Sequence, residues 1–486
     1  MTTQSASWAL QGGMDLVSPT LSVSPGRALL AQNYECDLTG RFRRMDGYTL
    51  YDGSASPVIV PGSGPVRGVH VYKGEVYACR DSDDGMAGVI YQSTVQGWVE
   101  IRRVNPGGVY EFRNHNFGGH SGTGMMYGVD GRNKAFQWDG TSYTEISTGM
   151  DHDTPHHLAI HKNHLFLGFS GGSLQHSGVG EPTDFTIIKG AAELGMGSEI
   201  TGLHSLKNNI LAVFAEDRIA LLYGSSSLDW DLRGYKLSSG AIARTMAEIE
   251  TDLHFYNGDE VASLFATQSF GDYESASVSA LVKPFVTGRA AQVVGAMVHR
   301  DKNQYRLFFN DKSVLVSTIY NRQLKGHTTW LIDHEPSCVT EGCMGCADGS
   351  VMKLDTTTGF NGGEIQSLFR SPFNSLRKPD VQKRFRKARV KLDAGITTTF
   401  NYVADYDFGQ GGKTVQPVSV HGAGGFWGIA RWDHFSWGGA FVSSAALPLN
   451  STACNISLMI AHKSATETPF TLDSMSLSYT PRRPSR

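Results

Sequence analysis

Three cysteines and one histidine lie close together in the sequence and have side chains that could hold a metal ion. Cys338, Cys343 and Cys346 follow His334 within a short segment. Thiolate and imidazole groups are the ligands that tetrahedral zinc takes in proteins. The spacing, however, gives one Cys-x-x-Cys pair rather than two. We therefore predict no metal site and keep zinc as a hypothesis that elemental analysis of the purified protein tests.

The histidines of the segment DHDTPHHLAIHKNHL have a similar pair of interpretations. In an extended strand, His157 and His161 fall on the same side, and His164 lies across the turn that follows. Such a group could bind a metal. A polar hairpin surface explains these residues better, and this is our prediction.

No segment carries a complete catalytic motif. DFGQGGKT, which begins at Asp407, is similar to a phosphate-binding loop but has an aspartate where that motif has its first glycine. No Gly-x-Ser-x-Gly frame is present, and the Ser-x-Asp-x-Gly-x-Thr-Trp turns of sialidase propellers are absent. The sequence therefore predicts no enzyme, no catalytic residue and no cofactor.

Composition narrows the class further. The chain has 486 residues, 40% of them hydrophobic, and a formal net charge of -3. General nucleic-acid binders usually carry a basic excess, so any contact with DNA has to be local. The sequence has no signal peptide pattern and no apolar stretch long enough to span a membrane. Six cysteines are too few for a disulfide scaffold, which favours synthesis in a reducing cytoplasm.

One segment is strongly basic. LRKPDVQKRFRKARVKL contains eight arginine and lysine residues and a single acid, Asp380. A strand that starts at residue 384 places its side chains alternately on two faces. One face has Arg384, Arg386, Ala388, Val390 and Leu392, and the other has Phe385, Lys387, Arg389 and Lys391. The segment is either a solvated strand, a salt-bridged subunit contact, or a wall that attracts the phosphates of DNA.

These side chains have to be positioned mainly by β-strands. The chain contains 56 glycines and many Asn-Gly and Asp-Gly pairs, which are typical of tight hairpins. Hairpin patterns such as LAIHKNHLFLGF return about every 45 residues, which is the repeat length of a propeller blade. We predict an all-β chain with a β-propeller of six or seven blades; an irregular array of β-sandwiches is the alternative.

The predicted propeller spans residues 55–364. Residues 1–54, with a basic patch at Arg41, Arg43 and Arg44, are expected to form an extended N-terminal arm. After residue 364 the period is lost, and residues 365–480 have the strand pattern of a separate C-terminal β-sandwich. The last residues, 481–486, are expected to form a flexible tail.

The order of these features resembles the tubular tail proteins, or nozzle proteins, of short-tailed bacteriophages. LQGGMDLVS, Asn33 and TGRFRRMDGY stand where that family has a Gly-Gly arm, an asparagine and a Gly-Phe/Leu-Arg-Arg/Lys-Pro-like stretch. The chain departs from the family at Met45, where proline is more common. A Ser-x-x-Gly-Asp/Glu-Pro-x-x-Phe/Trp pattern is matched by Ser177, Gly180, Glu181, Pro182 and Phe185.

The second half of the chain continues the resemblance. YGSSSLDWDLRGYKLSSGAIARTMAEIETDLHFYNGDEVASL is similar to the GSS turn, the Gly-Ala-Ile/Ala-Ala-Arg stretch and the following strand of that family. FWGIARWDHFSWGG resembles its Trp-rich sandwich. The propeller would then be a rigid mount, and the loop from Ser177 to Phe185 an architectural connection between blades without chemistry of its own.

The resemblance implies a structural virion protein, made in the host cytoplasm and placed in the phage tail. It would form a homohexameric ring that continues the DNA channel below the portal and adaptor proteins, contacts the genome during ejection and docks tail fibres. Arg384, Arg386, Lys387 and Arg389 would line the lumen or a subunit contact. Two alternatives stay open: a head-tail stopper, and a propeller that binds or hydrolyses glycans and carries carboxylates at its central mouth.

Overall fold

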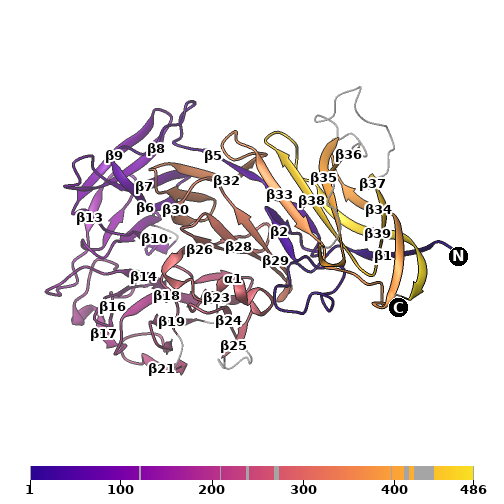
Figure 1. The fold of residues 1–486 in the computed structure, drawn as a ribbon. Helices are drawn as coiled ribbons and strands as arrows, with labels where there is room; N and C mark the ends of the chain where they lie inside the picture. The colour runs from indigo at the N-terminus through magenta and orange to yellow at the C-terminus, as the bar shows by residue number, and fades with distance from the viewer. Residues whose placement is uncertain are drawn as a thin grey trace.

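The computed structural model describes residues 2–119, 122–207, 209–236, 240–266, 273–395, 397–409, 415–420 and 443–484. Nearly all regular structure in these ranges is β. Figure 1 shows a ring of small sheets on one side of the molecule and two larger sheets on the other. The all-β class and the propeller are therefore confirmed. FWGIARWDHFSWGG and QGGKT lie outside the described residues.

The described residues form seven blades of four antiparallel strands each. Blade 1 is β6 (Ser63–Tyr72), β7 (Glu75–Asp81), β8 (Gly88–Thr94) and β9 (Gly97–Val104). Blade 2 is β10 (Glu111–His115), β11 (Met125–Val129), β12 (Phe136–Trp138) and β13 (Tyr143–Glu145). Blade 3 is β14 (His157–His161), β15 (His164–Gly168), β16 (Ser173–His176) and β17 (Ala192–Gly195). Blade 4 is β18 (Ile200–Leu206), β19 (Ile210–Ala215), β20 (Ile219–Tyr223) and β21 (Asp231–Lys236). Blade 5 is β22 (Ala247–Ile249), β23 (Asp252–Tyr256), β24 (Val261–Ala266) and β25 (Tyr273–Ser277). Blade 6 is β26 (Val293–His299), β27 (Gln304–Phe309), β28 (Ser313–Tyr320) and β29 (Gln323–Leu331).

Tight turns explain why the repeated pattern forms blades. In blade 3, Lys162 and Asn163 have φ angles of 46° and 60°. Two successive positive φ values give the hairpin turn that matches the twist of antiparallel strands. His161 therefore pairs with His164 across the turn, and the apolar side chains of β14 and β15 become buried between neighbouring blades.

Blade 7 combines the end of the propeller sequence with its beginning. It consists of β30 (Pro336–Thr340), β31 (Cys343–Cys346), β32 (Val351–Thr357) and β5 (Gly47–Leu50). Strand β5 pairs antiparallel with β32, with Tyr48 opposite Leu354. The ring is thus closed by hydrogen bonds between segments about 300 residues apart in the chain.

Strand β5 needs a glycine at its first position. A Cβ atom on Gly47 would lie 1.9 Å from the carbonyl oxygen of Gly359. We expect Gly47→Ala to lower the free energy of unfolding by about 1–3 kcal/mol, because the backbone of the closing strand has to shift. Gly195→Ala is the matched control, since a Cβ there meets nothing within 4 Å. Urea denaturation of both variants tests this, and equal stability would contradict the tight closure.

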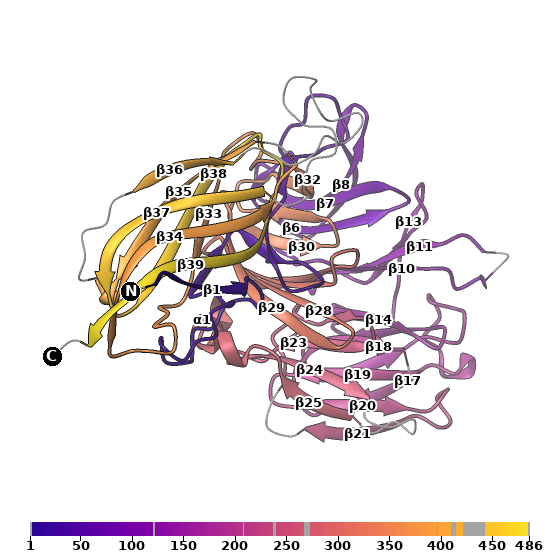
Figure 2. The same cartoon turned by 90° about the vertical axis from the view of Figure 1, so that its right-hand side faces the viewer.

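Two larger sheets pack beside the propeller. Blade 6 continues through β2 (Leu30–Gln32), β33 (Ile365–Arg370), β38 (Ile456–Ser464), β35 (Thr398–Tyr406) and β36 (Gln416–Val420) into a nine-stranded sheet. The second sheet contains β3 (Tyr34–Cys36), β4 (Phe42–Arg44), β39 (Thr471–Pro484), β34 (Val381–Asp393) and β37 (Ser443–Ala453), and β1 (Gln4–Ala9) pairs with β39. Figure 2 shows these strands gathered beside the blades, with β1 next to β39.

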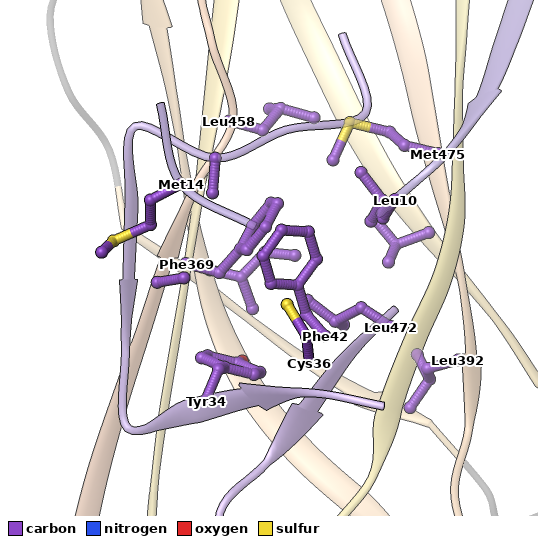
Figure 3. Packing of buried hydrophobic residues seen from close by; sticks show 14 of the residues in the cluster. Leu10, Met14, Tyr34, Cys36, Phe42, Phe369, Leu392, Leu458, Leu472 and Met475 are labelled. Carbon is purple, nitrogen blue, oxygen red and sulfur yellow. The ribbon is translucent and has the colours of Figure 1, made fainter. Parts of the chain in front are cut away.

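The two larger sheets enclose one hydrophobic core, part of which Figure 3 shows from close by. Rings from both sheets meet there: the centroids of Phe42 and Phe369 are 5.0 Å apart. Between blades 5 and 6 lie the short helix α1 (Lys283–Val286) and the 3-10 turns η3 (Ala280–Val282) and η4 (Ala290–Gln292). Elsewhere in the described residues, 3-10 turns are formed by η2 (Ile187–Lys189) and η5 (Asp407–Gly409). No described helix has the length and apolar character needed to cross a membrane.

Three predicted boundaries are wrong. Residues 1–54 are not an extended arm, because they supply four strands to the larger sheets and one to blade 7. Residues 365–480 do not form a separate sandwich, since their strands extend blade 6 and pair with N-terminal strands. The tail is shorter than predicted, because β39 continues to Pro484; residues 485–486 lie outside the described part of the chain.

The junction between the propeller and the larger sheets is held by a buried ionic cluster. Lys302 donates to Glu35 at 3.0 Å, to Asp46 at 2.8 Å and to Asp355 at 2.7 Å. Arg306, which is fully buried, donates to both carboxylate oxygens of Asp355 and lies over the ring of Trp330. These contacts join the N-terminal strands to blades 6 and 7.

The predicted basic patch of the arm is also part of this junction. Arg43 pairs with Glu35 and Asp46. Arg44 is fully buried and donates to the carbonyl oxygens of Thr358, Ser464 and Glu467 at 2.8–2.9 Å. Arg41, which is about as exposed as Arg43, pairs with Asp37. The patch is therefore structural, because all three charges are paired or hydrogen-bonded within the chain.

Candidate functional site

The cysteine cluster lies inside blade 7. Cys338, Cys343 and Cys346 are buried free thiols of β30 and β31. Burial raises the pKa of Cys338 and Cys346 to about 12 each and that of Cys343 to about 11. Zinc takes thiolates, whereas these groups are thiols packed among apolar side chains. Within the described ranges, no three His, Cys, Asp or Glu residues are grouped to hold a metal ion.

The prediction of a polar histidine surface is wrong. His157, His161 and His164 are all buried. Each has a protein partner: Glu111 for His157 at 2.9 Å, the hydroxyl of Ser205 for His161 at 2.8 Å, and the carbonyl oxygen of Ser177 for His164 at 2.6 Å. In a propeller both faces of a blade are covered by neighbouring blades, so alternating polar residues need not face solvent.

Several buried histidines of the chain predict that the stability of the fold decreases in acid. Burial lowers the pKa of His161, His176, His254 and His327 to about 4 each, from an ordinary 6.5. Below about pH 6.5 the unfolded chain binds protons that the folded chain does not, so stability is full above this pH and decreases until about pH 4. We expect the Tm to fall steadily from about pH 7 to 4.5. A constant Tm over this interval would contradict the neutral burial of these side chains.

The loop from Ser177 to Phe185 joins β16 to β17 within blade 3. The prediction that this loop connects two blades is therefore wrong. Ser177 is buried, and its carbonyl oxygen accepts hydrogen bonds from His164 and His176. Gly180, with φ 72°, donates from its backbone to the carbonyl oxygen of Asn163 at 2.8 Å. The loop is thus tied to the neighbouring hairpin turn.

The remaining motif residues of this loop are nearer the surface. Glu181 pairs with Lys189 at 3.0 Å, both side chains being about half exposed. Pro182 is partly buried, and Phe185 packs against the core of blades 2 and 3. These contacts support a structural role for the loop, without any group of side chains arranged for catalysis.

Strand β34 carries the basic residues on one exposed sheet face. Arg384, Arg386, Arg389 and Lys391 are exposed, whereas Phe385, Ala388, Val390 and Leu392 are buried in the core. The predicted division, which separated Arg384 and Arg386 from Arg389 and Lys391, is wrong. The register shifts between Phe385 and Lys387 in the pairing of β34 with both neighbouring strands. A β-bulge adds one residue to the alternation and so brings all four cations to the same face.

Two other lysines of the segment have different roles. Lys387 lies at the irregularity and is only partly exposed. Lys383 is buried and donates to the carbonyl oxygens of Lys378, Val381 and Cys454 at 2.6–2.8 Å. Burial lowers its pKa. Lys383 therefore anchors the start of the strand and is not available to a ligand.

The surroundings of the four exposed cations are small and polar. β34 lies between β37 and β39, and Arg386 donates to the hydroxyl of Thr480 at 3.0 Å. In the described ranges, no carboxylate pairs with any of the four. The residues opposite Arg384, Arg389 and Lys391 on the two neighbouring strands are Thr452, Thr480, Ala446, Ser476, Ser444 and Ser474.

We call Arg384, Arg386, Arg389 and Lys391 with these small neighbours the cationic face. Figure 1 places β34 on the side of the molecule opposite β16, so the loop of blade 3 and the cationic face are far apart. Within the described part of the chain, the cationic face has positive charge without a carboxylate partner, and the neighbours named above include no bulky side chain. Such a surface suits a polyanion bound through its phosphates without reading its sequence.

A cavity of about 510 Å³ lies where the first strands of the blades meet at the centre of the propeller. Its lining contains the carboxylates Glu111, Glu248 and Glu341 and the arginines Arg113, Arg244 and Arg300. The sequence reasoning missed these residues. The available signal was the charged side chains in first strands whose neighbours are apolar, as in Glu111 beside Phe112.

The carboxylates of the cavity are paired. Arg113 and His157 each lie 2.9 Å from Glu111. Burial raises the pKa of Glu111, but the charge of Arg113 and the hydrogen bond from His157 outweigh it and hold the pKa below its ordinary value. Glu248 lies 3.5 Å from both His204 and Lys207, and its pKa is lowered in the same way against the effect of burial. Glu341 pairs with Arg300 at 3.2 Å.

No protein-family model matches this chain, and a search of curated proteins finds no match. Among solved structures, the chain is similar to a streptogramin B lyase, with 13% sequence identity, a TM-score of 0.45 and coverage of 63% of this chain and 97% of that one. Virginiamycin B lyase from Staphylococcus aureus has 13% sequence identity and a TM-score of 0.44, with coverage of 60% of this chain and 94% of that one. BBS1N in complex with ARL6DN has 9% sequence identity and a TM-score of 0.41, with coverage of 65% of this chain and 99% of that one. At these values the likeness says nothing of activity.

Proposed function

We propose that this protein is a structural component of a short bacteriophage tail, of the nozzle type. It assembles into a closed ring, continues the DNA channel below the portal and adaptor, and offers its outer surface to fibres. The proposal is supported by the order of motifs from LQGGMDLVS to GAIAR and by the cationic face. The virion tail is its proposed location.

The cationic face is the observation that carries the proposal. A channel wall has to attract the genome and still let it slide, so its contacts must be with phosphates and not with bases. Four exposed cations on one face of β34, with Ser, Thr and Ala opposite three of them, meet both needs. Alternate residues of a strand lie about 6.6 Å apart, which is close to twice the rise of about 3.4 Å per nucleotide in duplex DNA.

The genome would pass between copies of the chain and not through the propeller. The central cavity has a volume of about 510 Å³, which is the size of a small-molecule site. A ring of several chains has a wider opening, and it requires the same heterologous contact to be repeated by a rotation. In this arrangement the propeller is a rigid mount and the sheet that contains β34 faces the lumen.

Glycan hydrolysis is the less well supported function. A general acid needs a raised pKa, whereas the neighbours of Glu111 and Glu248 hold their pKa values low. The proposal therefore includes no catalytic step.

Quantitative mass spectrometry of purified phage particles tests the proposal. We expect a fixed ratio of about one copy of this chain to two copies of the portal protein, as a sixfold ring below a twelvefold portal requires. Absence of the chain from particles would overturn the tail assignment. A fixed ratio near one to one would favour a stopper or adaptor layer in place of the nozzle.

A further inference from the structure

Arg244, in the GAIAR segment, places its guanidinium group in the lining of the central cavity. The backbone there has a φ of 62°, an uncommon conformation for a residue other than glycine. The carbonyl oxygen of Arg244 accepts a hydrogen bond from the backbone of Ala296 at 2.8 Å. The start of β26 therefore holds the arginine in this position.

The side chain of Arg244 reaches across the propeller. Its Nη2 atom donates to the carbonyl oxygen of Val109 at 3.3 Å. Arg244 precedes blade 5, and Val109 precedes blade 2; in a ring of seven blades these lie on opposite sides. The hydrogen bond thus spans the ring, and Arg244 lines the cavity between the two sides.

Most N–H donors of this guanidinium group have no hydrogen-bond acceptor among the described residues. A guanidinium has five N–H donors, and the described structure gives that of Arg244 a single hydrogen bond, at 3.3 Å. Its Nε atom is buried and has no hydrogen-bond partner among the described residues. The carboxylate of Glu111 is already engaged by Arg113 and His157. Burial lowers the pKa of Arg244 against the charge of Glu111, as expected for a cation that lacks a direct ion pair.

The remaining lining favours a ligand with hydroxyl groups. Glu248 and Glu341 supply carboxylate oxygens, which can accept further hydrogen bonds beside their contacts with His204, Lys207 and Arg300. Met246, Met297 and Val339 supply apolar surface between the charges. The volume of about 510 Å³ is within the range of small-molecule sites.

We infer that the central cavity binds an acidic saccharide of one or two rings, with its carboxylate on Arg244 and its hydroxyl groups on Glu248 and Glu341. A guanidinium group recognises a carboxylate through two parallel hydrogen bonds. A compact inorganic anion fits less well, because it would leave most of the cavity of about 510 Å³ empty. This site does not depend on the tail assignment.

Binding is tested with the full chain and three probes: sodium D-glucuronate, D-glucose and inorganic phosphate. Ligand-observed NMR titrations give the affinity of each. We expect glucuronate to bind at least about tenfold more tightly than glucose, a difference of about 1.4 kcal/mol, and phosphate to leave the glucuronate signal unchanged. Equal affinity for glucuronate and glucose, or full displacement by equimolar phosphate, would overturn the inference.

Variants locate the site. Arg244→Gln is expected to remove the preference for glucuronate over glucose, whereas Arg218→Gln on the surface of blade 4 is expected to keep it. Because Arg244 also contacts Val109, circular dichroism has to show that the variant is folded. If it is not, Glu248→Gln replaces it, with an expected loss of affinity for both sugars. Unchanged binding in a folded Arg244→Gln protein would contradict the assignment.

Discussion

Asp355→Asn is expected to lower the free energy of unfolding by about 3 kcal/mol. Asp355 is the acceptor for Lys302 and for both terminal nitrogens of the fully buried Arg306. These cations hold the pKa of Asp355 far below its ordinary value, against the effect of burial. Removing one charge from a buried pair costs more than the pair itself contributes, because the partner is left uncompensated.

The choice of asparagine isolates the charge. Asp355 has a φ of 57°, a conformation that asparagine also adopts readily. The effect stays near the low end of the range for buried pairs, because Glu35 remains 3.9 Å from Arg306. Glu100→Gln is the control: its partner Arg103 is exposed, and we expect a loss below about 1 kcal/mol. Urea denaturation of both variants gives the comparison, and equal midpoints would show that the junction does not depend on this charge.

The propeller could be predicted from the sequence because each blade depends on local hairpins. The turn at Lys162 and Asn163 and its repeats fix pairing between strands a few residues apart. The closure of the ring could not be predicted in this way. It depends on β5 finding β32, and on β2, β3 and β4 joining strands near the C-terminus. Short strands of three or four residues carry too little pattern to indicate such distant partners.

The candidate sites, like the fold, could be predicted from the sequence only where they depend on local residues. The basic character of β34 is visible in the sequence, but the bulge near Arg386 depends on the pairing with two neighbouring strands. One extra residue was enough to change which cations share a face. Arg244 belongs to the GAIAR motif, but the motif does not indicate a place in the central cavity, because that place depends on the blade geometry that brings Arg244 close to Val109.

The cationic face should give the chain a measurable affinity for duplex DNA. With four phosphate contacts, the logarithm of the binding constant should fall with the logarithm of salt concentration with a slope of about -3.6. Between about 50 and 200 mM salt this is a loss of roughly 150-fold in affinity. Fluorescence anisotropy with a labelled duplex measures both quantities.

Reversing three of these charges should remove most of this binding. For the variant Arg384→Glu, Arg386→Glu, Arg389→Glu, we expect an affinity at least about 100-fold lower at 50 mM salt, since three contacts become repulsive. The matched control reverses Lys189, Arg218 and Arg233, which are exposed or partly exposed cations of blades 3 and 4. It changes the net charge by the same amount at a distance from β34, and it should weaken binding only slightly.

The pair of variants separates the cationic face from the total charge of the molecule. An equal loss in both would mean that DNA responds to net charge alone, and the lumen assignment of β34 would be wrong. Normal DNA affinity in the β34 variant, together with loss of the ring in light scattering, would make the face a subunit contact instead. Loss of DNA binding with the ring intact is the result expected of a channel wall, because phosphates attracted along the lumen need cations that no neighbouring subunit has neutralised.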